Sequence, residues 1–537
     1  MDSLNLPLQE PLSQTVPPPG FTTSARQVVA IAERTRVATE VHRKHPDARP
    51  KALIWNGSQW EVDYFDVDRA RAEVDVSRDG KVLAAWSGLK AESYLARGHF
   101  GGLFDSPWIF APFALLFLVP FIDPQRPFRM LHVDLLTLLS FGVSYWLFVH
   151  GRPNAGVTLV YPVLLYLLAR MLLAGLRPIR PQGKLVPRMP TTLLAIGLVA
   201  LVGARVGLNV ASDQVVDVGY ASVVGADRIA HQQPLYVDNA SHGDTYGPIT
   251  YIAYIPFELA FPWHGAWDSL PSAHAAAIAF DLLTLLGLFL LGRQMRAGPE
   301  GRRLGLALAW AWAAFPFTLF GLMQNTNDGL VAMLIVYALL LYRRSPAARG
   351  AMLGLAAAAK FLPGALLPLF ASGRDTSGWR RAAQCWLAAL VVTVLAFALF
   401  LPDGGVREIW NCTLGYQLSR QPDFSIWGIH DGIGWTQTVA MVAALGFAAL
   451  LAFVPRQRSF VQLCALGAAV TIALQIPAGH WFFFYIVWFV PLVLVALFGA
   501  YVHEREGLTP VLSKDWGLRW PAADAPRNGA ARDAVAR

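Results

Sequence analysis

The chain has 537 residues, of which 55% are hydrophobic and 15% are charged, whereas soluble domains usually carry about 25% charged residues. This deficit of charge excludes an ordinary soluble protein and indicates a protein that lies mostly in a lipid bilayer. The formal net charge of +8 does not indicate a nucleic-acid partner, because the Lys and Arg residues fall mainly in short connections between apolar segments. The cysteines Cys385, Cys412 and Cys464 are widely spaced, so they predict neither a disulfide framework nor a metal cluster.

The N-terminal part of the chain predicts a tail followed by a small folded domain. Residues 1–20 contain several prolines and no apolar stretch like that of a signal peptide, so we expect a disordered tail without a cleavable export signal. Residues 21–107 predict a small α+β domain, loosely similar to PepSY-type domains. In it, residues 26–42 place apolar groups at helical spacing, and the segments WEVDYFDVD and VSRDGKVLAAW alternate like strands, with an Asp79-Gly80 turn in the second.

From about residue 108 onward, apolar segments of membrane-spanning length follow one another. The predicted fold is therefore an all-α polytopic membrane protein with about 11 to 13 transmembrane or re-entrant segments, preceded by the small α+β domain. We divide this part into N-terminal membrane helices at 108–178, a main membrane module at 191–501 and a C-terminal cytoplasmic tail at 502–537. The expected apolar helices are 131–149, 156–176, 191–210, 272–292, 303–321, 329–342, 350–371, 381–401, 433–454, 459–476 and 480–501.

The connections between these segments predict the orientation in the membrane. Short basic connections are typical of cytoplasmic loops, whereas the longer connections 211–247 and 402–432 are acidic and are expected to face outward. For these assignments to agree, residues 350–371 must enter the membrane and return at the break that follows Lys360. By the same parity argument we expect that 108–122 does not cross, which leaves the N-terminal domain in the cytoplasm. The basic residues assigned to the cytoplasm are Arg177, Arg180, Lys184, Arg188, Arg293, Arg296, Arg302, Arg303, Arg343, Arg344, Arg349, Arg374, Arg380, Arg381, Arg456 and Arg458.

Several sequence features occur in the order that is typical of one enzyme family. An Asp follows a span and precedes a Tyr and a small-residue helix, and then come Pro-Leu-Tyr at 234–236 and Tyr-Gly-Pro at 246–248. The stretches FPFTLFGLMQNTNDGLVAMLIVYALLLYRR and GAMLGLAAAAKFLPGALLPLF add a Pro-bearing span, a Gln-Asn turn and a Gly-rich helix that ends in Lys-x-x-Pro. Over about residues 191–501 the chain therefore resembles the C-type glycosyltransferases, most closely glycosyltransferase family 87.

The resemblance implies a GT-C-like helical bundle and the transfer of a hexose, such as mannose, from a polyprenyl-phosphate sugar donor. The implied acceptor is a lipid or a cell-envelope glycan on the extracytoplasmic side. The implied location is a bacterial plasma membrane, which the chain crosses several times. The resemblance also implies that the catalytic carboxylate lies in the outward acidic loop.

The acids of the 211–247 connection supply the candidate catalytic base. Attack by an acceptor hydroxyl on an anomeric carbon needs a base that takes the proton while a phosphate leaves. Asp217 matches the Asp-x-x-Tyr position after the span and is the predicted base, although a solvated or helix-capping Asp is the simpler interpretation. Asp213, one turn away, is the alternative base or a partner that raises the pKa of Asp217. Asp227 and Arg228 are expected to form a surface ion pair on an amphipathic helix over 218–230.

Cations and polar groups at the predicted outward face supply the remaining candidates. The predicted ligands of the donor phosphate are Lys360, Arg420 and His480, and snorkelling to the interface is the alternative for Lys360. Turn formation or membrane-interface packing is the simpler role for most of the other candidates. No cofactor is predicted, and a divalent metal ion remains open, because His242 and Asp244 alone would make a very incomplete site. The candidate substrate-binding residues are Tyr220, His242, Asp244, Tyr246, Gln324, Asn325, Asn327, Asp328 and Trp427.

Two other functions compete with a transferase. A transporter or flippase for a lipid-linked sugar would need a polar path through the midplane, where the spans offer few charges. Asp134 and Asp281 lie near span ends, and the other acids concentrate in the loops. A membrane scaffold whose N-terminal domain binds a partner protein is the third possibility.

Overall fold

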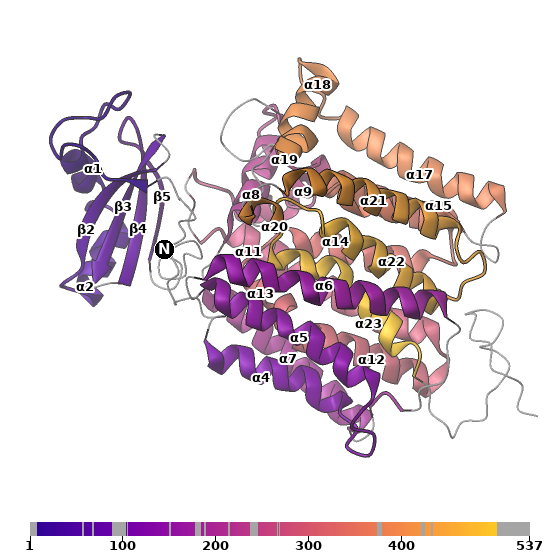
Figure 1. Cartoon of the computed structure of the whole chain (residues 1–537). Helices are drawn as coiled ribbons and strands as arrows, with labels where there is room; N and C mark the ends of the chain where they lie inside the picture. Colours follow the sequence, from indigo (N-terminus) through magenta and orange to yellow (C-terminus); the bar gives the residue numbers. More distant parts are fainter. Residues whose placement is uncertain are drawn as a thin grey trace, which may run out of the picture.

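The computed structural model describes residues 8–501 apart from gaps at 56–57, 67–68, 88–103, 105, 150–151, 178–183, 187–188, 213–214, 237–244, 266, 268, 373–377, 420–424 and 431–432. A small sheet domain lies beside a large helical bundle (Figure 1). This arrangement confirms the predicted fold class, a helical polytopic membrane protein with a small N-terminal domain.

The N-terminal domain is an antiparallel meander in the order β1-β2-β3-β4-β5, with helices packed on one face. Its apolar core includes Trp60, Val62 and Val74, whose side chains alternate with the acids of the same strands. The single helix expected over 26–42 is split, because Thr35 caps a second helix by accepting the N–H of Ala38. The elements are β1 Leu8–Gln9, α1 Ala25–Ala32, α2 Arg36–Lys44, β2 Arg49–Trp55, β3 Gln59–Asp66, β4 Arg69–Ser77 and β5 Val82–Ser87.

Two expectations for this domain can be compared directly with the structure. The strand and turn pattern is confirmed, since β4 and β5 are joined through Gly80, which has a left-handed φ of 91°. The expected disordered tail is wrong at its end, because Leu8 and Gln9 pair with Trp55 and Ile54 of β2.

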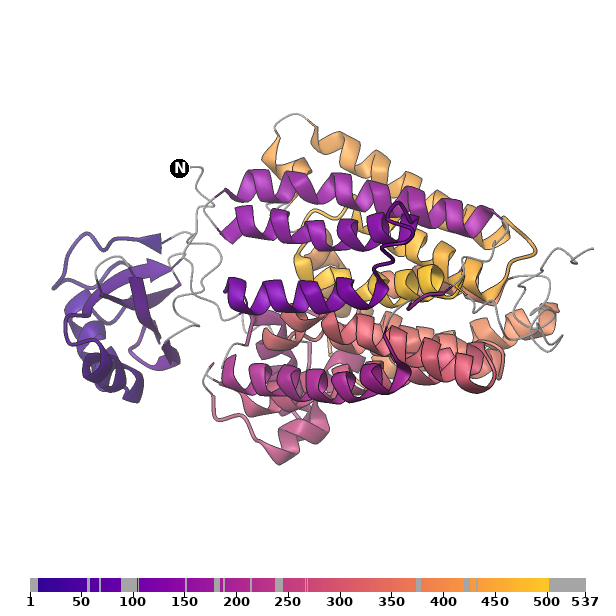
Figure 2. The same cartoon turned by 90° about the horizontal axis from the view of Figure 1, so that it is seen from below.

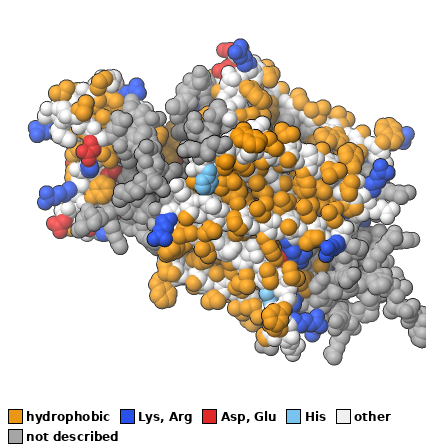
Figure 3. Space-filling view, viewed as in Figure 1, with side chains coloured by type: hydrophobic (Ala, Val, Ile, Leu, Met, Phe, Trp, Pro, Cys, Tyr) orange, Lys and Arg blue, Asp and Glu red, His pale blue; other side chains and the backbone are white. Residues whose placement is uncertain are grey.

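The bundle consists of apolar helices that run side by side (Figures 1 and 2). Six of the described helices are long and apolar enough to cross a membrane, or up to seven if the pair α12 and α13, bent by 59°, counts as one span. Its sides are apolar (Figure 3), and exposed side chains such as Val199 and Leu387 suit contact with lipid tails. The elements are α4 Pro107–Leu118, η3 Val119–Phe121, α5 Met130–Val149, α6 Pro153–Leu176, α7 Thr191–Ser212, α8 Asp217–Ala230, α9 Pro248–Ile252, α10 Ile255–Ala260, α11 Pro271–Met295, α12 Gly298–Ala314, α13 Pro316–Met323, α14 Asp328–Leu341, α15 Pro346–Ala359, η4 Leu362–Leu366, α16 Leu367–Ala371, α17 Trp379–Ala398, α18 Gly405–Trp410, η5 Asn411–Gly415, α19 Tyr416–Ser419, α20 Ile426–Ile429, α21 Gly434–Phe453, α22 Phe460–Gln475, η6 Phe483–Tyr485 and α23 Ile486–Phe498.

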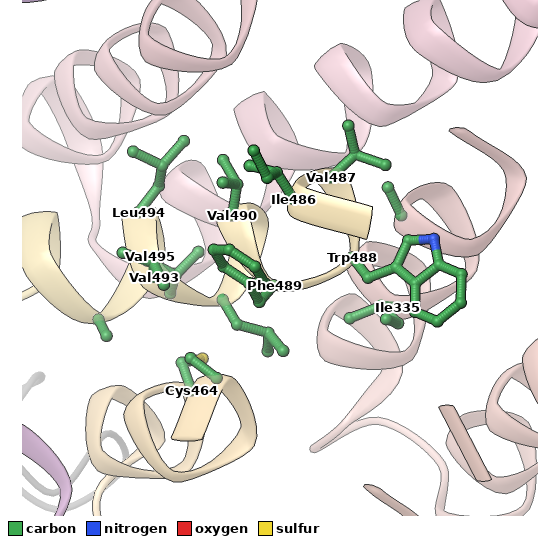
Figure 4. Close-up of a cluster of buried hydrophobic side chains, with 14 of the residues drawn as sticks. Ile335, Cys464, Ile486, Val487, Trp488, Phe489, Val490, Val493, Leu494 and Val495 are labelled. Carbon is green, nitrogen blue, oxygen red and sulfur yellow. The ribbon is translucent and has the colours of Figure 1, made fainter. Parts of the chain in front are cut away.

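The centre of the bundle is packed around α23. Its side chains Trp488, Phe489 and Val493 are buried, and they lie near Ile335 of α14 and Cys464 of α22 (Figure 4). The indole nitrogen of Trp488 is drawn in blue in Figure 4, and its hydrogen-bond partner belongs to the candidate site described below.

The bundle has two chemically different ends. One end carries α8, α9 and α18, and we call it the α8 end (Figure 1). The opposite end, called the basic end, holds Arg296, Arg349 and Arg458, whose guanidinium groups donate to main-chain carbonyls at helix ends.

The predicted re-entrant hairpin over 350–371 is confirmed. Helix α15 ends at Ala359, and the chain returns through η4 and α16, which pack back on α15. At the end of the return, the Ser372 carbonyl accepts from Arg458 of the basic end at 2.8 Å. Residues 350–371 therefore enter and leave at the same end of the bundle.

The expectation that 108–122 does not cross is wrong. Before α4, Phe104 packs against Phe320 near the α8 end, with ring centroids 4.8 Å apart. After α4, Phe121 packs against Phe498 near the basic end, with centroids 4.7 Å apart. The segment thus runs from one end of the bundle to the other, although α4 is too short to be recognised as a span by its length. The N-terminal domain consequently lies at the α8 end, opposite the basic loops.

Candidate functional site

Helix α8 begins at Asp217, at the α8 end of the bundle. The Asp217 side chain is exposed, and its Oδ1 accepts the N–H of Val218 at 2.8 Å. The carboxylate therefore sits at the N-terminal end of the helix, beside its first main-chain N–H groups. The N-cap position belongs to Val216, so Asp217 does not cap the helix as the simpler interpretation supposed. An exposed carboxylate in this position can receive a proton from a bound hydroxyl group.

The turn between α13 and α14 holds the start of α8. The main-chain carbonyl of Gln324 accepts the N–H of Val216 at 3.1 Å. The Asn327 side-chain amide donates to the Val218 carbonyl at 3.2 Å and to the Ser222 hydroxyl at 3.0 Å. Both residues, predicted to bind sugar, are buried and hold the helix that carries Asp217.

Asp328 and Lys360 form a buried ion pair where α14 begins and α15 ends. Lys360 Nζ lies 2.7 Å from Asp328 Oδ1, which also accepts the Trp488 indole N–H at 2.9 Å. The ammonium lies over the rings of Tyr246, Trp488 and Tyr485, at 5.0, 5.5 and 6.0 Å from their centroids. Cation–π attraction and the ion pair together keep the charge of Lys360 away from the interface, so it does not snorkel.

Tyr246 lies beside the ion pair, and its hydroxyl is within the electrostatic reach of Asp217. Burial raises the pKa of the Tyr246 hydroxyl well above its ordinary value, and the carboxylates of Asp217 and Asp328 raise it further. Both carboxylates therefore act electrostatically on one phenol hydroxyl, and the ammonium of Lys360 lies over its ring. The cation, the two acids and the ring form one polar cluster at the α8 end.

The sequence features that suggested a family explain how Tyr246 is held. The Tyr236 hydroxyl donates to the Tyr246 carbonyl at 2.9 Å, and the Tyr246 N–H donates to the Tyr251 hydroxyl at 2.9 Å. The next residue is Gly247, whose N–H donates to the Ala359 carbonyl at 3.1 Å, immediately before Lys360. A side chain at Gly247 would collide with the carbonyl of Ala358, so only glycine allows this close approach.

A second polar network lies behind the α13–α14 turn. Asn325, which has a left-handed φ of 53°, accepts from Asn209 of α7 at 2.7 Å, and His274 of α11 lies 2.9 Å from the Asn209 amide oxygen. Farther along α7, Arg205 pairs with Asp281 through two hydrogen bonds of 3.1 and 2.6 Å. The polar residues of α7 were overlooked in the sequence, although an Arg and an Asn inside an apolar span are a recognisable signal.

The other predicted site residues lie at separate places, and four fall outside the described residues. Tyr220 stacks on Trp267, and the Trp427 indole donates to the Ile476 carbonyl at 3.3 Å, near the half-buried His480. The residues outside the described part are Asp213, His242, Asp244 and Arg420.

The expected ion pair between Asp227 and Arg228 is replaced by other contacts. Asp227 lies 3.0 Å from His231 one turn later, and the buried Arg228 donates to the Leu235 carbonyl at 3.2 Å. Arg228 thereby holds the chain that leads into the Pro-Leu-Tyr segment.

Acids with the spacing of metal ligands occur, among the described residues, in the N-terminal sheet. Glu61, Asp63 and Glu73 offer carboxylate oxygens that lie within 4.8 Å of one another. This group is separate from the cluster around Tyr246, and the open question of a metal at His242 and Asp244 concerns residues outside the described part.

The bundle and its cluster define the class of this molecule as a polytopic membrane protein with a polar site at one end. Residues 245–477 match the model of glycosyltransferase family 87, which confirms the resemblance to this family of membrane glycosyltransferases. The matched region contains Tyr246, the α13–α14 turn and Lys360, and it begins after α8 and Asp217.

One similar curated protein is the polyprenol-phosphate-mannose-dependent alpha-(1-2)-phosphatidylinositol mannoside mannosyltransferase of Mycolicibacterium smegmatis. It is 32% identical to this chain over 203 residues, which cover 34% of this chain and 43% of the relative. The chain therefore matches less than half the length of this relative. No solved structure matches the chain.

Proposed function

We propose that the protein transfers a hexose from a polyprenyl-phosphate sugar to a lipid or cell-envelope glycan acceptor at the α8 end. The observation that carries this proposal is the buried ion pair of Lys360 and Asp328 beside Tyr246, whose hydroxyl is also within the electrostatic reach of Asp217. The exposed acid and the buried cation would provide a proton acceptor and an anion ligand for the same substrate pair. The polyprenol-phosphate-mannose dependence of the relative supports this donor class, with mannose as the first sugar to test.

Asp217 acts as the general base in this proposal, with Asp213 as the alternative. The acceptor hydroxyl oxygen attacks the anomeric carbon, and its proton passes to the Asp217 carboxylate. The bond between the anomeric carbon and the phosphate oxygen breaks, and polyprenyl phosphate leaves with the electron pair. Because the attack comes from the face opposite the phosphate, we expect inversion at the anomeric carbon.

Lys360 compensates the charge of the leaving phosphate. An ammonium has three N–H donors, and within the described residues the structure gives Lys360 one hydrogen-bond acceptor, Asp328. Two donors can therefore turn to phosphate oxygens without breaking the ion pair. In this buried setting the attraction is stronger than in water. Arg420 and His480 remain further phosphate candidates, and Tyr220 and Trp427 remain candidates for the sugar or the lipid.

The α8 end is proposed to lie on the extracytoplasmic side of a bacterial plasma membrane. The basic residues Arg296, Arg349 and Arg458 lie at the other end, and short basic loops are retained in the cytoplasm. A lipid-linked donor and an envelope acceptor would then both reach Asp217 at the outer membrane surface.

The decisive experiment compares Asp217→Asn with Asp227→Asn in purified full-length protein reconstituted in lipid. Asp227 is a matched control because it lies on the same helix and contacts His231. With labelled polyprenyl-phosphate mannose and envelope acceptors, we expect Asp217→Asn to lower transfer about 10²- to 10⁴-fold and Asp227→Asn to leave it near wild type. Equal transfer by the two variants would remove Asp217 as the base.

The same vesicles test the rival function. A transporter or flippase would move the labelled lipid-linked sugar across the bilayer without forming a glycosidic product. Movement of label without transfer in the wild-type protein would therefore replace the transferase proposal.

A further inference from the structure

The last strand of the N-terminal domain pairs with a loop of the membrane bundle. The N–H of Trp267 donates to the Leu83 carbonyl at 3.2 Å, and Ala84 forms a parallel bridge with Trp267. The Ala84 side chain is only 2% exposed, and it packs against Trp267. The edge of the sheet is thus extended by one residue of the segment between α10 and α11, the kind of main-chain pairing by which an exposed strand recruits a partner.

The same tryptophan also contacts the start of α8. Its indole N–H donates to the Val215 carbonyl at 2.9 Å, two residues before Asp217. Its ring stacks on Tyr220 with centroids 4.6 Å apart and planes 4° from parallel, and Trp263 meets Tyr220 edge-on at 5.9 Å. Trp267 therefore joins three elements: β5 through its backbone, the approach to α8 through its N–H, and α8 itself through its ring.

An electrostatic contact indicates that the acidic face of the sheet is close to α8. Burial raises the pKa of the Tyr220 hydroxyl to about 12, Arg228 lowers it, and the Asp75 carboxylate of β4 raises it. Asp75 lies opposite Glu61 of β3 and opposite Ala84 of β5, the residue that meets Trp267. The backbone pairing at Trp267 thus places the sheet beside α8, and the effect of Asp75 on Tyr220 agrees with this placement.

We infer that the N-terminal sheet domain lies on the same side of the membrane as Asp217. Through Trp267 the domain also fixes the start of α8, so that it acts as a positioning element for the transferase site. The positioning role rests on the proposed function, whereas the location of the domain does not. The mechanism is geometric. Gln324 and Asn327 hold α8 on one side, and Trp267, whose backbone is paired with β5 of the domain, holds it on the other. A base that is held from two directions keeps its distance from the acceptor hydroxyl, and misplacement by about 1 Å can cost a factor of about 10² in rate.

The location is tested by single-cysteine labelling in a background in which Cys385, Cys412 and Cys464 are replaced by alanine. Asp47→Cys marks an exposed turn of the N-terminal domain, Asp403→Cys marks the α8 end, and Arg344→Cys marks the basic end. With a membrane-impermeant maleimide on intact spheroplasts, we expect Asp47→Cys and Asp403→Cys to react before lysis and Arg344→Cys only after it. If Asp47→Cys instead shares the accessibility of Arg344→Cys and differs from Asp403→Cys, the inference is overturned. This comparison does not depend on which side of the membrane the basic end faces.

The positioning role is tested by steady-state kinetics of full-length Trp267 variants. Trp267→Ala removes the indole N–H and the ring, and we expect kcat to fall about tenfold while the KM for the donor stays unchanged. Trp267→Phe keeps a ring over Tyr220 and should recover part of kcat. Because a loss of folded protein would also lower the apparent kcat at unchanged KM, the rates are normalised to the folded fraction of each variant. A wild-type kcat per folded molecule in Trp267→Ala would overturn the positioning role.

The second variant disrupts the contact between β5 and Trp267 by a substitution in the N-terminal domain. Ala84→Glu places a charge in the contact with Trp267, whereas Lys81→Glu changes an exposed residue of the neighbouring turn and serves as its control. We expect Ala84→Glu to reproduce the kcat defect of Trp267→Ala and Lys81→Glu to behave like wild type. If Ala84→Glu fails to fold, Trp267→Phe against Trp267→Ala still decides the matter.

These outcomes separate the inference from the proposed function. Wild-type kcat in the Trp267 and Ala84 variants, together with an inactive Asp217→Asn, would remove the positioning role and keep the base. Full activity of Asp217→Asn would instead remove the base, and the labelling result would still locate the domain.

Discussion

Two buried ion pairs in the described part of the bundle differ in their surroundings. In the first, Arg205 gives Asp281 two hydrogen bonds, donates to the Ala313 carbonyl at 2.8 Å, and shares Asp281 with the Trp312 indole. In the second, Lys360 gives Asp328 one hydrogen bond, and the other neighbours of the ammonium are aromatic rings. Among the described residues, Asp328 Oδ2 is buried without a hydrogen-bond partner.

This difference in hydrogen bonding distinguishes a structural ion pair from a functional one. A buried charge is tolerated when its hydrogen bonds are satisfied, as those of Arg205 and Asp281 largely are. The pair of Lys360 and Asp328 keeps donors and an acceptor atom that its own contacts do not use, and such groups mark functional sites in native proteins. We therefore expect the first pair to determine stability and the second to determine activity.

The largest effect is expected from breaking the structural pair. Arg205→Met leaves the Asp281 carboxylate buried without its cation, which should lower the free energy of unfolding by about 3–5 kcal/mol. The neutral double variant Arg205→Met/Asp281→Leu should recover most of this loss, because no uncompensated charge remains. Thermal unfolding in detergent micelles measures both, with Arg293→Met at the exposed basic end as the control.

Activity per folded molecule completes this test. The double variant of Arg205 and Asp281 should transfer sugar at a rate close to wild type. A stable but inactive double variant would show that this network also serves the reaction, and the proposed division between the two pairs would be abandoned.

The second effect concerns the functional pair, for which the opposite outcome is expected. Lys360→Gln/Asp328→Asn is also neutral and should unfold near the wild-type temperature. Its transfer rate should nevertheless fall about 10²- to 10³-fold, because the cation that faces the leaving phosphate is lost. Transfer of labelled sugar by protein in lipid, normalised to folded protein, measures the change.

A comparison with Lys360→Arg sharpens this result. Arginine keeps the charge but presents a planar fork instead of a compact ammonium, so partial activity is expected. Wild-type transfer by the neutral double variant would exclude Lys360 as the phosphate ligand and leave Arg420 and His480 as the candidates.

Much of the bundle could be predicted from the sequence because long apolar segments have few alternatives to a membrane helix. The hairpin at Lys360 followed from the parity of the basic loops and from the break at Pro363. The side of the N-terminal domain could not be predicted in this way, because α4 is shorter than a usual span. The decisive contact, between Ala84 and Trp267, joins distant parts of the chain and leaves no local pattern.

The sequence predicted several residues of the candidate site but not the contacts between them. Lys360 and Asp328 were predicted from their polarity near span ends and Tyr246 from the Tyr-Gly-Pro feature of the family, and the structure brings all three together. Asp328 was expected to bind sugar, but it pairs with Lys360, 32 residues away, and with Trp488, 160 residues away. Such contacts depend on helix packing, which the composition of single segments does not determine.

The smallest expected effect is the pH dependence of the stability of the N-terminal sheet, whose buried acids lie close to one another, whereas Asp281 and Asp328 of the bundle each face a cation. Burial raises the pKa of Asp63 to about 8, and the neighbouring Asp75 carboxylate raises it in the same direction. The folded domain therefore keeps a proton that the unfolded chain releases at its ordinary pKa near 4. This contribution to stability is fully present below that value and is lost as the pH rises through about 8. Between pH 6.5 and 8.5 we expect the sheet to lose about 1–2 kcal/mol of protection.

Hydrogen–deuterium exchange in the full-length protein measures this loss, with exchange rates corrected for the pH dependence of the unfolded amide. Peptides of β3 and β4 should lose protection as the pH rises, whereas peptides of α22, whose buried residues include no carboxylate, should not. Asp63→Asn should flatten the dependence in the sheet, and Asp47→Asn, at an exposed turn, should leave it unchanged. An equal pH dependence in Asp63→Asn and wild type would mean that the other acids of the sheet hold the proton. The contrast would then be between the ion pairs of the bundle, in which Asp281 and Asp328 each face a cation, and a sheet whose acids share protons as a group.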